Sequence, residues 1–88
     1  MSDHFQKLSQ QLQLEKWPSV YLFKFIMPND SYLIRKVIQN FDKEAIITRS
    51  SSKTAKYIAI SIKQMMANSE IVIEKYRQIS KLKGVISI

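Results

Sequence analysis

The sequence contains no cysteine. This absence excludes disulfide bonds, thiolate nucleophiles and the commonest structural zinc sites. Histidine is almost absent as well, because His4 is the only one. A single histidine without cysteine does not make a transition-metal site. We therefore expect no metal and no cofactor, and a fold that depends on packing alone.

Glycine and proline are scarce, with one Gly and two Pro in 88 residues, and 45% of the residues are hydrophobic. This composition is typical of one compact globular domain. No apolar stretch approaches the length of a membrane span, and residues 1–13 are too polar for a secretory signal. The sequence therefore predicts a cytoplasmic protein that does not enter a membrane.

Acidic residues are outnumbered by basic ones, 7 against 14, which gives a net charge of +7. No acid lies between Glu44 and Glu70. Such a field could attract nucleic acid, an acidic protein or anionic lipid, or could simply be solvated surface. The net charge alone does not discriminate between these possible partners and a surface that is only solvated.

Hydrophobic periodicity predicts a short helix within residues 4–17 and then an apolar strand over Ser19–Met27, because Pro18 ends any helix. Alternation along the strand divides its side chains between two faces. The predicted core face is the uncharged one, with Tyr21, Phe23, Phe25 and Met27.

The rest of the chain continues the pattern of strands and helices. We predict a helix over residues 32–41, capped by Asn29 or Asp30, and a second helix from Asn68 or Ser69 to about Leu82, followed by Gly84 in a left-handed conformation. The further strands are predicted at residues 44–50, 56–64 and 85–88, with a turn over residues 50–55.

This order of elements predicts an α+β fold, a ferredoxin-like βαββαβ sandwich. Its four-stranded antiparallel sheet has strand order 4-1-3-2, and two helices cover one face. Residues 1–18 form a helical extension, and residues 19–88 form a single domain. The most apolar strands are central, and the short or charged ones lie at the edges.

Specific segments resemble the YbeD-like family of small bacterial proteins of unknown function. The segments that carry the resemblance are Trp17-Pro18, residues 21–26, Ser51-Ser52-Lys53, residues 56–62 and Glu74-Lys75-Tyr76. The resemblance covers about residues 14–88. It implies a ferredoxin-like fold similar to small regulatory domains of the ACT type, and no established activity. Members often carry Gly after the first strand and after the Ser-Ser-Lys triplet, where this chain has Met27-Pro28 and Thr54.

The outer face of the predicted sheet is the main candidate interaction surface. It is both apolar and basic, and it comprises Val20, Leu22, Lys24, Ile26, Tyr57, Ser61 and Lys63. A sheet-to-sheet dimer, nucleic acid, or the N-terminal helix packed through Phe5, Leu8 and Leu12 could cover it. Nucleic acid is disfavoured, because only Tyr57 is placed to stack on a base.

A second candidate is the turn Ser51-Ser52-Lys53, whose hydroxyls, amides and cation could hold an anion. Met65 and Met66 are interpreted as hydrophobic plugs. No nucleophile with a base, carboxylate pair or metal cluster can be assembled, so we expect no enzyme and no catalytic residue.

The sequence thus favours a regulatory or protein-interaction domain that acts through the sheet face or its edges, with an unknown protein or a second copy as partner. A small-effector sensor of the ACT type, a binder of single-stranded nucleic acid and an enzyme with an unconventional site remain as alternatives.

Overall fold

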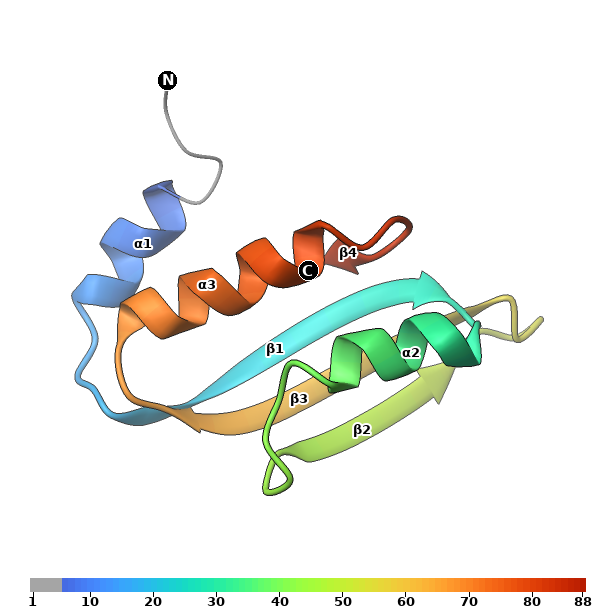
Figure 1. The fold of residues 1–88 in the computed structure, drawn as a ribbon, viewed down its shortest axis with the longest axis horizontal. Coiled ribbons are helices and arrows are strands. Elements are labelled where there is room, and N and C mark those ends of the chain that lie inside the picture. The colour runs from blue at the N-terminus through green and yellow to red at the C-terminus, as the bar shows by residue number, and fades with distance from the viewer. Residues whose placement is uncertain (1–5) are drawn as a thin grey trace.

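The computed structural model describes residues 6–88, and Figure 1 shows their arrangement. Three helices and four strands follow one another along the chain. Their bounds are α1 Gln6–Gln13, β1 Ser19–Pro28, α2 Ser31–Ile38, β2 Ile46–Ser51, β3 Tyr57–Met66, α3 Ser69–Ser80 and β4 Ile86–Ser87. The fold is α+β, as predicted.

All neighbouring strands of the single four-stranded sheet are antiparallel. The order is β2-β3-β1-β4, which reads 4-1-3-2 from the other edge. β1 and β3 are central and pair from Ser19↔Met66 to Pro28↔Tyr57. β4 pairs with β1 only at Phe25 and Ile26, so it is a very short edge strand.

The core lies on one side of the sheet, where α2 and α3 pack against alternate residues of the central strands. Phe23 and Ile60 are both fully buried there, on the face that alternation predicted. The cluster contains Leu12, Phe23, Phe25, Met27, Ile34, Val37, Ile58, Ile60, Ile62, Met66, Val72, Ile73, Tyr76 and Ile79. One leucine of α1 therefore joins the same core as the sheet and the two longer helices.

The helix starts follow the predicted capping chemistry. Asp30 Oδ1 accepts a hydrogen bond from Tyr32 N at 2.9 Å, and Asn68 Oδ1 accepts one from Ile71 N at 2.9 Å. After α3, Gly84 has φ of 91°, the left-handed conformation that a glycine adopts without strain. These three predictions are confirmed.

Helix α2 ends at Ile38, three residues earlier than predicted. Asn40 Nδ2 donates to the carbonyl of Lys36 at 3.0 Å, so a side chain satisfies one of the last helical carbonyls. The ammonium of Lys75 in α3 donates to the carbonyl of Asn40 and lies 5.5 Å from the Phe41 ring centroid. The segment that follows α2 is therefore in contact with α3 at this point.

The other boundaries also differ slightly from the predictions. α1 ends at Gln13, before Trp17, whose indole Nε1 donates to the carbonyl of Leu12 at 2.8 Å. β3 extends to Met66, and β2 begins at Ile46. The extension of β3 changes which side chains reach the sheet surface, because Met65 now belongs to a strand.

Ala55 has φ of 59° in the turn between β2 and β3. A residue with a β-carbon in this region costs roughly 1–2 kcal/mol, whereas glycine adopts it freely. We expect Ala55→Gly to raise the free energy of unfolding by about 0.5–1 kcal/mol, after the larger unfolded-state entropy of glycine is subtracted. Urea denaturation measures the change, with the nearby Thr54→Gly as control; a destabilised Ala55→Gly variant contradicts the prediction.

Candidate functional site

The side of the sheet opposite α2 and α3 carries all the residues of the predicted interaction surface. We call this side the open face. On the central strands it comprises Val20, Leu22, Lys24, Ile26, Tyr57, Ala59, Ser61, Lys63 and Met65. The register places Leu22 opposite Lys63 and Lys24 opposite Ser61, so the predicted residues form one continuous patch.

Much of this apolar patch is exposed. The exposed fractions are 60% for Val20, 41% for Leu22 and 55% for Tyr57, while Lys24 and Lys63 are also exposed. Isolated exposed apolar residues are ordinary, but a contiguous patch on one sheet face indicates an interaction site.

The edge strands enlarge the open face in a way that the sequence did not predict. Ile46 of β2 pairs with Lys63, and Ile86 of β4 pairs with Ile26, so both side chains join the same side. Ile46 is 64% exposed and Ile86 62%. Alternation along β2 and β4 could have placed them there, once the strand order was known.

Met65 corrects a prediction. It is 61% exposed and pairs with Val20 on the open face, whereas Met66 is buried in the core. The interpretation as a hydrophobic plug is therefore right for Met66 and wrong for Met65. The reason is that β3 continues through both residues, so their side chains point to opposite faces.

Helix α1 does not cover the open face. It lies beside the start of α3, as Figure 1 shows, and Leu12 is buried in the core with Leu8 packed against it. The alternative in which Phe5, Leu8 and Leu12 pack on the outer sheet face is therefore wrong for the two leucines, and Phe5 lies outside the described residues. Among residues 6–88, no helix shields the patch.

The charge of the open face is positive. Lys24 and Lys63 are its charged strand residues, and none of its strand positions is acidic. Two carboxylates, those of Asp42 and Glu44, line a hollow of about 240 Å³ at one end, together with Ile46, Lys63 and Met65. The surface therefore presents aliphatic groups and ammonium groups, with acids only at one rim.

A comparison with family models matches residues 13–88 to the family described as "Protein of unknown function (DUF493)". The chain belongs to the DUF493 family. Comparisons with the curated proteins and with the solved structures gave no match. The family description assigns no activity, so the surfaces of this DUF493 chain must be interpreted from their chemistry.

The predicted anion-binding turn is partly occupied by its own hydrogen bonds. Ser52 N donates to the carbonyl of Tyr57 at 3.0 Å, and Ser52 Oγ accepts from Tyr57 N at 3.3 Å. Ser51 belongs to β2, and Lys53 is exposed beside it. These bonds close the hairpin, and they leave the Lys53 ammonium as the group best placed to meet an anion.

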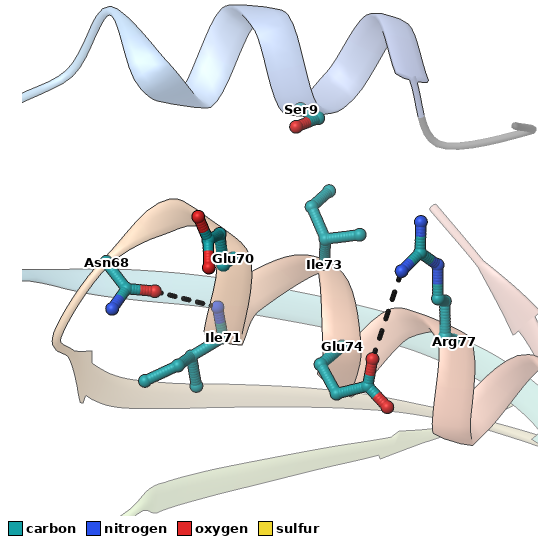
Figure 2. A pocket seen from close by; sticks show the side chains of 7 residues that line it. All are labelled: Ser9, Asn68, Glu70, Ile71, Ile73, Glu74 and Arg77. Atoms are coloured by element: carbon teal, nitrogen blue, oxygen red, sulfur yellow. Dashed lines mark hydrogen bonds and ion pairs between the residues drawn. The ribbon is translucent and has the colours of Figure 1, made fainter.

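A groove of about 480 Å³ separates α1 from α3 in this DUF493 chain (Figure 2). Ser9 approaches from α1, while Glu70, Glu74 and Arg77 extend from α3. Arg77 Nη1 lies 4.0 Å from Glu74 Oε2, and both side chains are about half exposed. An exposed ion pair of this kind contributes little stability.

Tyr76 has the one strongly shifted side-chain pKa among the described residues. Burial and a hydrogen bond between its hydroxyl and that of Tyr21, 3.0 Å apart, raise this pKa well above its usual value. Its hydroxyl therefore stays protonated near neutral pH. The pair connects β1 to α3 in the core.

Metal ligands do not gather in the described part of the chain, where no group of three or more His, Cys, Asp or Glu could hold an ion. Within residues 6–88, no helix is long and apolar enough to cross a membrane. Among the described residues, the open face brings together more of the predicted site residues than the Ser51-Ser52-Lys53 turn does.

Proposed function

We propose that this chain is a non-enzymatic protein-interaction domain of ferredoxin-like fold that acts through its open face. The observation that carries the proposal is the contiguous exposure of Val20, Leu22, Ile46, Met65 and Ile86 on a side that no described helix covers. Burial of an aliphatic side chain of this size is worth about 1.5–3 kcal/mol, so a partner that covers several of them gains substantial binding energy.

The partner that fits this surface is a protein segment with aliphatic and acidic side chains. Aliphatic groups would cover Val20, Leu22 and Met65, and carboxylates would pair with the ammonium groups of Lys24 and Lys63. The net charge of +7 would also steer an acidic partner toward the domain.

A second copy of the chain is a poorer occupant. A face-to-face dimer would bring two sheets together that each carry Lys24 and Lys63, while the acids Asp42 and Glu44 lie only at one rim. Two chains of net charge +7 also repel each other. Single-stranded RNA is disfavoured because Tyr57 is the only aromatic residue on the open face among the described residues.

We also propose that the chain is a YbeD-like protein, that it is cytoplasmic, and that it has a regulatory role. These proposals are supported by the segments that resemble that family. An ACT-like effector site is less well supported, since Pro28, Asn29 and Asp30 provide no glycine after β1.

The test uses a fluorescently labelled peptide in which leucine and glutamate take turns at every second position, with serine between them, so that an extended chain presents both on one face. The same peptide with lysine in place of glutamate is the control, because it matches the length and the aliphatic content. We expect saturable binding of the acidic peptide at physiological salt and none of the basic peptide, measured by fluorescence anisotropy.

Three outcomes would overturn the proposal. The first is equal binding of the two peptides. The second is absence of binding of the acidic peptide. The third is a chain that is already dimeric at micromolar concentration by sedimentation, with Leu22→Asp converting it to a monomer, because the open face would then be occupied by a second copy.

A further inference from the structure

A cleft on the helical side of the sheet has a different chemistry from the open face. It lies between α2 and β2 and has a volume of about 610 Å³. Its lining residues are Asn29, Ser31, Ile34, Arg35, Ile38 and Arg49. Arg49 pairs with the buried Ile60, so it points to the side of the sheet that the helices cover, opposite the open face.

Two arginines line this cleft from different elements, Arg35 from α2 and Arg49 from β2. Among the described residues, no acidic one lines it. Among residues 6–88, no ion pair or side-chain hydrogen bond holds either guanidinium. Two like charges that share a hollow without a counter-charge repel each other, and an anion bound between them removes that cost.

Guanidinium groups favour a particular class of anion. Each presents a planar fork of N–H donors that matches the oxygens of a phosphate or carboxylate, and two forks suit a doubly charged oxyanion. The carboxylate of Asp30 lies outside the lining and accepts a hydrogen bond from Tyr32 N. The Asp30 carboxylate is thus engaged at the start of α2. The guanidinium groups of Arg35 and Arg49 supply the attraction for an anion in the cleft.

The remaining lining selects for an organic ligand. Ile34 is 7% exposed and Ile38 is half-buried, which gives the cleft an apolar wall. Ser31 and Asn29 add a hydroxyl and an amide at the edge. The volume falls in the range of small-molecule sites, about 300–1,000 Å³.

We propose that this cleft binds a small organic phosphate monoester, with its phosphate between Arg35 and Arg49 and its apolar body against Ile34 and Ile38. The site is independent of the open face, because the two lie on opposite sides of the sheet. It would give the domain a ligand-binding surface in addition to its protein-binding surface.

The test titrates the full chain with phenyl phosphate, inorganic phosphate and benzyl alcohol, followed by the side-chain Nε–Hε signals of Arg35 and Arg49. We expect saturable shifts with phenyl phosphate, and weaker or no saturation with inorganic phosphate and with benzyl alcohol. Arg35→Gln and Arg49→Gln should each weaken phenyl phosphate binding by about tenfold or more, since each removes a charged hydrogen-bond donor.

Lys43→Gln is the matched control, because it removes the same charge from an exposed residue that does not line the cleft. It should leave the affinity unchanged. Absence of saturable binding of phenyl phosphate, equal affinity for inorganic phosphate, or equal loss in the arginine and Lys43 variants would each overturn the proposal. A failure here leaves the peptide result on the open face unaffected, so the two proposals are tested separately.

Discussion

Phe23→Ala should lower the free energy of unfolding by about 3–5 kcal/mol, the usual cost of emptying a fully buried phenylalanine site. Phe23 is fully buried at the centre of an aromatic cluster. Its ring centroid lies 4.7 Å from that of Tyr21, 5.0 Å from Phe41 and 5.3 Å from Tyr76. β1, α3 and the segment after α2 therefore all lose contacts with this one ring.

A domain of this size has a total stability of about 4–13 kcal/mol, at about 0.05–0.15 kcal/mol per residue, so Phe23→Ala should remove from about a quarter to all of it. Leu22→Ala is the matched control, since it is the adjacent residue on the open face and is 41% exposed. It should cost less than about 1 kcal/mol. Chemical denaturation measures both, and similar losses for the two variants would contradict the assignment of the two faces.

The second large effect concerns the charge of the open face. We expect Lys24→Glu combined with Lys63→Glu to weaken binding of the acidic leucine–glutamate peptide by at least about tenfold and to allow binding of the leucine–lysine peptide. The reason is that the exposed ammonium groups of the central strands become carboxylates, while the aliphatic residues around them are unchanged.

The control for this reversal is Lys81→Glu combined with Lys83→Glu. Both lysines are exposed and follow α3, away from the open face, and the change in net charge is the same. This variant should keep the preference for the acidic peptide. If both double variants lose it equally, overall charge rather than the open face determines recognition.

The sequence predicted the sheet well where a local rule was sufficient. Strict alternation in the central strands placed Phe23 and Ile60 on the core side and Leu22 and Lys63 on the other. Capping at the helix starts and the left-handed Gly84 were predictable for the same reason, because each depends on a few adjacent residues.

Features that depend on distant segments were missed. The early end of α2 involves Lys75, which is far along the chain from Asn40. That Arg35 and Arg49 line one cleft depends on how the chain brings α2 and β2 together, and neither residue is distinctive alone. The positive φ of Ala55 was also unexpected, since glycine is the residue usually found there.

The candidate site was predicted in its central part only. The residues on β1 and β3 are brought together as expected, but Ile46, Met65 and Ile86 were not recognised as members. Their inclusion depends on the exact strand ends and on the pairing of the edge strands. Sequence patterns define strand ends less precisely than strand centres.

The most direct test of the proposed interaction is to map the acidic peptide by methyl NMR with a soluble paramagnetic probe. In the free protein, the methyl groups of Val20, Leu22, Ile46 and Ile86 should be strongly relaxed, because all four side chains are exposed. Binding of the leucine–glutamate peptide should protect these methyl groups, while exposed Ile71 on α3 stays relaxed. Protection of Ile71 instead, or open-face methyl groups that are already shielded in the free chain, would contradict the account.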